Sequence, residues 1–512
     1  LAYDLFGRLT NEVFVGLATN RFSYTAVGDL ASLVDGKNQT TAWGYDAEGR
    51  PFTKTIAGQL TWSNAYNSNG WLTTHWTPAR SNVTTYTYDA VGNVTSITNS
   101  SGLTPNVSLT YDQNNRLKTM ADAAGNTTFT WSELGTLAAE DGPWANDTIS
   151  FGYNDTGLRQ ALTLIQPNAS PWTQAYGYDG NWRLKELTSP AGGFTNTFLG
   201  ASRRLTRLAL ANGSVVTNAY DDLGRLLSTV LKNAGGGVLN AHTYGHDAAH
   251  QRTNQTLAEG NFWQYGYDAL GQLTGAQGRE AGGVTNRLHE QLSYGYDAAG
   301  NLIGWTNNGF VQVFTLTNNF NQLDRVTRGG TFTAAGLVQS ATNVTVTVKV
   351  NDETNGVSAT VYADKSFARA GITLIEGTNT FTAVATDTNT RTATNIVVAW
   401  LAATNSFTYD RSGNLTSDGR RGFGYDDFDQ LTSVTVTNAW RSEFKYDALG
   451  RRRVRTEKVW KNSQWVTASE TRYVYDHMLV IQERDALNLP TATYTRGLDL
   501  SGGLQRAGGI GG

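Results

Sequence analysis

The chain has 512 residues, of which 39% are hydrophobic and 16% charged, a balance that excludes an intrinsically disordered protein. Its formal net charge is −3 without long runs of Lys or Arg, so nucleic acid and anionic membranes are not expected partners. The absence of cysteine excludes disulfides, thiolate metal sites and cysteine nucleophiles. The longest apolar stretch, residues 396–403, is far shorter than the roughly 20 residues of a membrane-spanning helix, so no membrane insertion is expected.

From its first residues the chain repeats a unit of about 21 residues. An aromatic residue, or His246 in one unit, precedes a pattern of Asp, two variable residues, Gly, a polar residue and Leu or Val. Gly, Thr, Asn, Tyr and Trp are abundant and favour strands and turns, so we predict an all-β protein. The positions that mark the repeat are Tyr3, Tyr24, Tyr45, Tyr66, Tyr88, Tyr111, Trp131, Tyr153, Tyr178, Phe198, Tyr220, His246, Tyr267, Tyr296, Phe320, Tyr409, Tyr425, Tyr446 and Tyr475.

Each unit is predicted to be one β-hairpin. Alternation such as Tyr294-Gly-Tyr296 indicates a strand with both rings on one face, and the Asp that follows can bond the backbone two residues on. The Gly can adopt the left-handed conformation that closes a hairpin with a bulge. The residues expected to build these turns are Tyr3, Asp4, Gly7, Tyr45, Asp46, Gly49, Tyr88, Asp89, Gly92, Tyr220, Asp221, Gly224, Tyr267, Asp268, Gly271, Tyr296, Asp297, Gly300, Tyr409, Asp410, Gly413, Tyr446, Asp447 and Gly450.

Some units lack the turn glycine. Asn115 replaces it in one unit and tolerates positive φ, whereas Trp182, His250 and Leu479 do so less readily. We therefore expect turns of a different shape at these last three positions. Because a lone hairpin is only marginally stable, the units should pair edge to edge into one continuous sheet, with the marking aromatic residues on one face.

The repeated motif Y-D-x-x-G-R-L-T resembles the YD-repeat of the Rhs family, which includes toxin-complex shell subunits and teneurin ectodomains. The resemblance covers residues 3 to 475 apart from one long gap. It implies a sheet strip that spirals into a hollow shell or tube, in bacteria commonly around a toxic C-terminal polypeptide. We assign residues 1–332 and 404–496 to this array.

The long gap, residues 333–403, follows another pattern. Alternating β-branched residues with Gly-Asn and Asp-Thr-Asn turns predict five to seven short strands in a small β-sandwich. The segment "EGTNTFTAVATD" resembles bacterial immunoglobulin-like domains. Residues 497–512 are Gly-rich and resemble the stretch before the family's C-terminal segment, where many members carry an Asp-containing autoproteolysis motif and then an effector. That motif is not seen here, so neither a protease nor a cargo is assigned to the chain.

Two groups of residues were weighed as metal ligands, and the interpretation as turn residues is favoured for both. The histidines of "AHTYGHDAAH" are spaced by four, but they fall on a hairpin unit, where the alternation of a strand could bring only the first two to one face. The acidic residues of "DDFD" could form an oxygen-rich Ca²⁺ loop. The weak candidates are His242, His246, Asp426, Asp427 and Asp429.

The densest basic segment is "GRRRVR", residues 450–455, which we interpret as a solvent-exposed strand end. No catalytic or cofactor-binding motif is found, so catalytic residues and cofactors are not assigned. The predicted function is that of a non-enzymatic structural shell segment from a secreted or surface-exposed bacterial protein, which encloses or presents a C-terminal effector. Alternatives are a glycan-binding adhesin or a self-associating subunit of an extracellular fibre. A β-propeller would need a 42-residue pattern above the 21-residue one, and none is visible.

Overall fold

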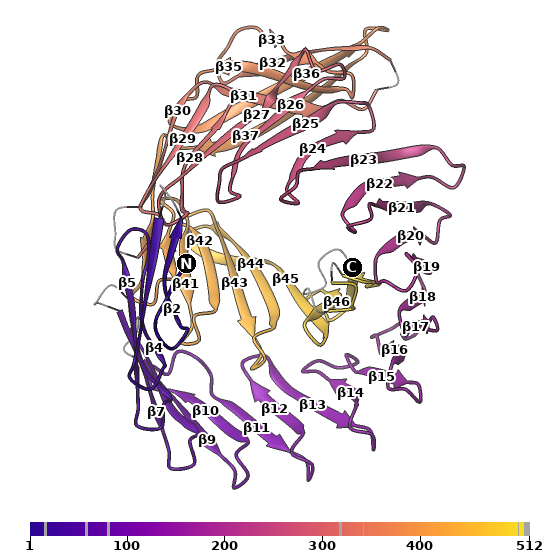
Figure 1. Cartoon of the computed structure of the whole chain (residues 1–512). Coiled ribbons are helices and arrows are strands. Elements are labelled where there is room, and N and C mark those ends of the chain that lie inside the picture. Colours follow the sequence, from indigo (N-terminus) through magenta and orange to yellow (C-terminus); the bar gives the residue numbers. More distant parts are fainter. Residues whose placement is uncertain are drawn as a thin grey trace. The chain divides into compact units, whose positions relative to one another are not determined.

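The structure is a computed structural model of the whole chain, and it describes residues 1–14, 18–56, 60–78, 82–316, 320–340, 342–499 and 501–505. Every helix or strand assigned to these residues is a β-strand, and the strands pair antiparallel in long sheets (Figure 1). The predicted all-β fold is confirmed. In the described part of the chain there is accordingly no helix with the length and apolarity to cross a membrane.

The chain divides into two compact units. The first comprises Leu1–Thr40 and Val216–Phe407, and the second comprises Thr41–Val215 and Thr408–Gly512. Strands β5 (Thr40–Tyr45) and β21 (Val215–Tyr220) lie at the boundaries. The hairpins are distributed over two long sheets. The first sheet ends with β38, which pairs with β30, and the strands after Phe407 form a separate nine-stranded sheet.

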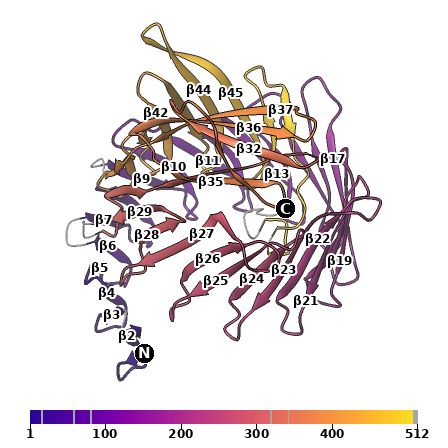
Figure 2. The ribbon, with the colours of Figure 1, turned by 90° about the horizontal axis from the view of Figure 1, so that it is seen from above.

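The hairpin strands of the first unit form two runs, β1 to β4 and β22 to β38, and within each run the strands of the long sheet pair in chain order (Figure 2). They are β1 (Ala2–Tyr3), β2 (Leu9–Phe14), β3 (Ala18–Tyr24), β4 (Leu30–Val34), β22 (Leu226–Lys232), β23 (Val238–His246), β24 (Arg252–Leu257), β25 (Phe262–Tyr267), β26 (Leu273–Arg279), β27 (Asn286–Tyr296), β28 (Leu302–Asn307), β29 (Phe310–Thr315), β30 (Arg325–Gly330) and β38 (Thr404–Ser406).

The second unit contains two layers of hairpins. The first layer is β6 (Pro51–Ile56), β7 (Leu60–Tyr66), β8 (Leu72–Thr77), β9 (Asn82–Tyr88), β10 (Val94–Asn99), β11 (Val107–Tyr111), β12 (Leu117–Asp122), β13 (Gly125–Trp131), β14 (Leu137–Asp141), β15 (Ile149–Tyr153), β16 (Arg159–Leu164), β17 (Trp172–Tyr178), β18 (Leu184–Ser189), β19 (Gly192–Phe198) and β20 (Leu205–Ala209). The second layer is β39 (Thr408–Tyr409), β40 (Leu415–Ser417), β41 (Gly422–Tyr425), β42 (Leu431–Val436), β43 (Trp440–Tyr446), β44 (Arg452–Lys461), β45 (Gln464–Asp476), β46 (Leu479–Arg484) and β47 (Pro490–Thr493).

A hydrophobic core lies between these layers of the second unit. Met120, Phe129 and Leu162 of the first layer are buried together with Val474 and Ile481 of the second. Burial of apolar surface stabilises such a pair of layers by about 25 cal/mol for each Å² removed from water, and it is the main favourable contribution. Within this unit, the first layer of hairpins therefore packs against the C-terminal hairpins of the second layer.

The turns share one hydrogen-bond pattern, seen clearly at Asp297. Its N–H donates to the carbonyl of Asn301 at 2.9 Å, and the Gly300 N–H donates back to the Asp297 carbonyl at 3.0 Å. The carboxylate oxygen Oδ1 accepts the N–H groups of Ala299 and Asn301, both at 2.9 Å. The eight glycines named with the predicted turns have φ between 77° and 98°, and the strand register shifts beside the marking residue. This is a type I turn closed by a glycine bulge.

Neighbouring hairpins are joined by tyrosine hydroxyls. The hydroxyl of a marking tyrosine donates to the carbonyl of the residue that opens the return strand of the previous hairpin, at 2.6 to 3.1 Å. Because the same bond recurs at the same register, the aromatic residues that make it share one face, as predicted. The donors and acceptors are Tyr24 and Leu9, Tyr66 and Pro51, Tyr88 and Leu72, Tyr111 and Val94, Tyr153 and Leu137, Tyr178 and Arg159, Tyr267 and Arg252, Tyr296 and Leu273, Tyr425 and Leu415, Tyr446 and Leu431, and Tyr475 and Arg452.

The prediction of differently shaped turns was wrong at Trp182 and His250 and right at Leu479. Trp182 and His250 have φ of 61° and 65° and donate to Asp179 and Asp247 as a glycine would. The surrounding ladder therefore imposes the left-handed conformation at a cost of about 1–2 kcal/mol. At Leu479 the strands β45 and β46 instead pair up to Asp476, which leaves a two-residue loop.

Residues 332–401 form two small sheets in the first unit. One sheet has the order β31 (Phe332–Leu337), β35 (Ser366–Ile372), β34 (Thr360–Val361), and the other the order β33 (Val357–Ser358), β32 (Val344–Val350), β36 (Gly377–Asp387), β37 (Thr392–Leu401). Val346, Val348 and Phe367 are buried between them. We call these residues the insert; its likeness to immunoglobulin-like domains stays a prediction.

Candidate functional site: a buried arginine and carboxylate cluster

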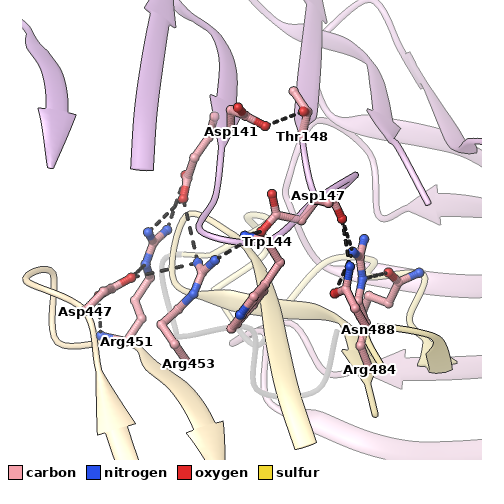
Figure 3. Close-up of polar contacts among 12 residues, drawn as sticks. Asp141, Trp144, Asp147, Thr148, Asp447, Arg451, Arg453, Arg484 and Asn488 are labelled. Atoms are coloured by element: carbon pink, nitrogen blue, oxygen red, sulfur yellow. Dashed lines mark hydrogen bonds and ion pairs between the residues drawn. The ribbon is translucent and has the colours of Figure 1, made fainter. Parts of the chain in front are cut away.

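One group of six buried charged side chains lies in the second unit where its two layers meet (Figure 3). We call them the acid–arginine cluster. None is more than 4% exposed, and the three carboxylates balance the three guanidinium groups in formal charge. The members are Glu140, Asp147, Asp447, Arg451, Arg453 and Arg484.

Both layers contribute to the cluster. Glu140 lies on β14 and Asp147 in the connection to β15, whereas Asp447 and Arg451 flank the turn between β43 and β44. This turn follows the same Asp-x-x-Gly-Arg pattern as the exposed turns, so an ordinary repeat places Arg451 there. The alternation of β44 then places Arg453 on the same side of the strand.

Arg451 holds two carboxylates. Its Nε donates to Asp447 Oδ2 at 2.7 Å, and its Nη2 and Nη1 donate to the two oxygens of Glu140 at 2.7 and 3.2 Å. Burial lowers the pKa of Arg451, but the attraction of Glu140 and Asp447 outweighs it and raises the pKa. Such a bidentate pair is among the stronger ion pairs in proteins because its geometry is fixed.

Arg453 lies at the centre of the cluster and makes longer contacts. Its Nη1 lies 3.9 Å from both Glu140 and Asp447, and its Nη2 lies 3.7 Å from Asp147 Oδ2. The guanidinium also stacks over Trp144, 4.9 Å from the ring centroid. Burial, followed by repulsion from Arg451, lowers the pKa of Arg453.

Arg484, at the end of β46, bonds mainly to backbone of the first layer. Its Nη2 donates to the carbonyls of Asn146 at 2.8 Å and Ile165 at 3.1 Å, and its Nε donates to Gln482 Oε1 at 2.7 Å. Burial lowers the pKa of Arg484 to about 10. The side chain thus anchors the last hairpin to the loop that carries Asp147.

Asp147 is the member most affected by burial. Its Oδ2 accepts the Trp144 N–H at 3.2 Å, but no donor among the described residues bonds to Oδ1. Burial raises the pKa of Asp147 to about 6, although Arg453 opposes the rise. The neutral form is therefore accessible to this acid at mildly acidic pH.

The Asp147→Asn variant is expected to remove a pH-dependent part of the stability of the second unit. Because the folded pKa lies above the ordinary value of 3.8, the contribution of Asp147 is fully present below that value and is lost as the pH rises through about 6. The wild-type free energy of unfolding should therefore fall by about 3 kcal/mol relative to that of the variant across this window. Urea unfolding between about pH 4 and pH 8 measures the difference.

Asp155→Asn provides the control, since Asp155 lies in the turn between β15 and β16 of the same unit and is exposed. This control should show the wild-type pH profile. A constant difference between wild type and Asp147→Asn across the pH range would contradict the protonation of Asp147.

The acid–arginine cluster joins the two layers of the second unit. Arginine is not a proton acceptor near neutral pH, and the carboxylates are held by the guanidinium groups and closed off from solvent. Among the described residues no group of three or more His, Cys, Asp or Glu side chains could hold a metal ion. Its chemistry is therefore the electrostatic joining of two layers of the second unit.

The histidines weighed as metal ligands lie in the first unit. His242 Nδ1 is 2.9 Å from Gln255 Nε2, and its ring stacks on Tyr244 with centroids 6.3 Å apart. His246 marks its unit beside the bulge of β23. His242 therefore stacks along its own strand and contacts Gln255 of the neighbouring strand β24.

The three aspartates of "DDFD" lie in the second unit and have different surroundings. Asp426 is a turn residue that accepts the N–H groups of Phe428 and Gln430. Asp427 is buried, and its Oδ2 accepts the Ser101 hydroxyl. Asp429 replaces the turn glycine with φ of 59° and accepts Asn414 Nδ2 at 2.7 Å.

The interpretation of residues 450–455 as a solvent-exposed strand end was wrong for two of its arginines. Arg451 and Arg453 are 2% and 1% exposed, because the second layer turns this strand toward Glu140 and Asp147. The sequence contains one signal that was missed, since Arg452 stands where most units carry Leu or Val and has a further arginine on each side of it. Glu140 and Asp147 carry no comparable signal, because their partners lie about 300 residues away.

Comparison with known proteins supports the repeat. The RHS Repeat family matches residues 66–104 and 246–285. The tRNA nuclease WapA of Bacillus subtilis strain 168 and the tRNA3(Ser)-specific nuclease WapA of Bacillus spizizenii are each 36% identical to the chain over 96 residues, which is 18% of this chain and 4% of each relative. The chain thus spans only a small part of these relatives.

Among solved structures, the Tc holotoxin pore of Photorhabdus luminescens, with a substituted TccC3, matches 96% of the chain with a TM-score of 0.51 and 15% identity. The crystal structure of TcdB2-TccC3-Cdc42 matches 91% of the chain with a TM-score of 0.48 and 15% identity. The chain covers 27% of the matched chain in each. The fold is that of a hairpin-repeat protein with long antiparallel sheets. The chain carries RHS repeats, and the resemblance stated from its YD motif is confirmed.

Proposed function

We propose that the chain is a non-enzymatic wall segment of a shell, in a secreted or surface-exposed bacterial protein, that encloses or presents a polypeptide linked to its C-terminal end. The observation that carries the proposal is the bond from a marking tyrosine hydroxyl to the previous hairpin, which recurs in eleven of the repeat units. Together with the antiparallel strand pairing, these bonds satisfy backbone N–H and C=O groups along successive hairpins. A wall of this kind excludes proteases by steric obstruction rather than by chemistry.

The C-terminal segment lies against the inner core of the second unit. Leu498 and Leu504 pack on the core between the two layers, and Gln505 Nε2 donates to the carbonyl of Asp476 at 3.0 Å. Asp499 is 5% exposed and closes a turn with Gly502. A polypeptide linked at this end would therefore start from a segment that is held by the layers of this unit.

The comparisons support a shell role at the level of fold. The matched Tc holotoxin pore contains TccC3, and this chain has a fold similar to that of the matched chain. The WapA relatives are named as nucleases, but the shared 96 residues are only 4% of their length. We therefore assign the nuclease activity of those proteins to no residue of this chain.

The test is protection of a linked polypeptide. An unstructured polypeptide fused after Gly512 should be cleaved at least about tenfold more slowly by a broad-specificity protease than the same polypeptide fused before Leu1. Cleavage is followed by loss of a fluorophore on the fused segment, with the integrity of the chain checked in parallel. Equal cleavage rates of the two fusions would contradict the proposal.

The alternative of a glycan-binding adhesin has its best support in a shallow groove of the second unit. Trp43, Lys54 and Trp62 lie in a row across β5, β6 and β7, and His75 lines the same groove of about 460 Å³. The Lys54 ammonium lies 5.8 Å from the Trp62 ring, so that ring already has a cation–π partner. We therefore place this function second.

A further inference from the structure

The insert has an open side between its two small sheets. β31 lies at one end of the three-stranded sheet and β37 at one end of the four-stranded sheet. A cavity of about 470 Å³ lies between these two edge strands, with Phe332 and Val338 on one side and Val397 and Leu401 on the other. No charged residue lines it. The sandwich is therefore least closed along β37.

Strand β37 carries apolar residues to solvent on both faces. Ile396 and Val398 are 60% and 64% exposed on its outer face, and Val397, which lines the cavity, is 52% exposed. Within Thr392–Leu401 there is neither a charged residue nor a proline. A long edge strand without charge, proline or bulge is a template for pairing with another strand.

The opposite edge of the same sheet shows the usual protection. There β33 is only two residues long, Val357–Ser358. Short edge strands offer few backbone groups to a partner. The exposure of β37 is therefore specific to that edge, and among the described residues β36 is the only strand that pairs with it.

We propose that β37 pairs antiparallel with β37 of a second copy of this chain about a two-fold axis. A two-fold interface brings the same patch of both copies together and must be self-complementary. With Val397 on the axis, Val397 faces its own counterpart and Ile396 faces Val398 of the second copy. Every residue in these central pairs is apolar and β-branched, a combination that favours cross-strand packing.

The charges at the two ends of β37 favour the antiparallel direction. Arg391 precedes the strand and is 74% exposed in its side chain, with Nε and Nη2 bound to Asp387, so Nη1 can reach a second carboxylate. Glu376 lies at the other end, where its Oε2 accepts the Ala403 N–H at 2.6 Å. Antiparallel pairing places Arg391 of each copy beside Glu376 of the other, whereas parallel pairing would place like charges together.

Pairing would join two four-stranded sheets into one sheet of eight strands. The outward backbone groups of β37 would then donate and accept hydrogen bonds, and Ile396 and Val398 would pack against their counterparts. The interface concerns the insert alone and is independent of the proposed shell function.

Sedimentation analysis of the full chain tests the proposal. Wild-type protein should change with concentration from the mass of one chain to twice that mass. The double variant Ile396→Lys and Val398→Lys should remain a single chain at concentrations at least about tenfold higher, because like charges would face each other across the axis. Both side chains are exposed in the single chain, and circular dichroism checks that the variant folds. Val357→Lys, at a 49% exposed position on the opposite edge, should dimerise as the wild type does.

A cross-link test locates the axis, and the absence of cysteine makes it specific. The Val397→Cys variant should form a covalent dimer with a short thiol-reactive linker, whereas Val357→Cys should not. Wild-type protein that stays a single chain throughout, or dimers that are unaffected by the lysine variant, would overturn the proposal. So would binding of an unrelated extended peptide to β37 by a chain that remains monomeric.

Discussion

Replacement of Arg451 by methionine is expected to destabilise the second unit by about 3–5 kcal/mol. Methionine keeps much of the apolar stem but removes every donor to Glu140 and Asp447, two carboxylates that are 4% exposed. Their remaining guanidinium neighbour, Arg453, lies 3.9 Å from both and is itself desolvated. The loss should appear as a lower urea midpoint and as faster amide exchange in β14 and β44.

Arg50→Met is the matched control for this prediction. Arg50 occupies the same position of its repeat in the same unit, and its Nε donates to Asp46 Oδ2 at 2.6 Å. Its side chain is 27% exposed, and within the described part of the chain it pairs only with Asp46 and Glu48 of its own turn. Because exposed pairs contribute about 0–1 kcal/mol, its loss should be small. Equal destabilisation by both variants would show that Arg451 acts only within its turn.

Replacement of Arg287 by methionine is expected to cost about 3–5 kcal/mol in the first unit and to loosen the insert from β27. Arg287 is 2% exposed and lies within 3.0 Å of Glu280, Glu290 and Asp364. Burial lowers the pKa of Arg287, but hydrogen bonds to Asp364 and Glu280 outweigh it and raise the pKa. Without the guanidinium, three acidic groups would be left facing one another.

Hydrogen exchange measures this second effect locally. Exchange should increase in β34 and β35, which precede and follow Asp364 in the insert, more than in β22 and β23. Arg225→Met is the control, because Arg225 pairs at 2.6 Å with Asp221 of its own turn and is 25% exposed. If exchange in the insert is the same in both variants, Arg287 does not hold the insert on β27.

The repeat could be predicted because its causes are local. An Asp that accepts the N–H two residues on, and a residue that adopts positive φ, lie within five positions of each other in the chain. The same reasoning failed at Trp182 and His250, because the intrinsic preference of one residue was weighed without the ladder on both sides of it. Sequence reasoning identified the marking tyrosines but did not predict that their hydroxyls bond to the previous hairpin.

An all-β hairpin array with an insert follows from local sequence patterns, because turns and strand alternation depend on residues a few positions apart. The burial of Arg451 and Arg453 opposite Glu140 and Asp147, and the place of β37 at an open edge, arise only in the folded chain. The burial of a charge depends on which layer covers it, and the exposure of a strand depends on which strand lies beside it. Both depend on contacts between residues far apart in the chain, which a local pattern does not encode.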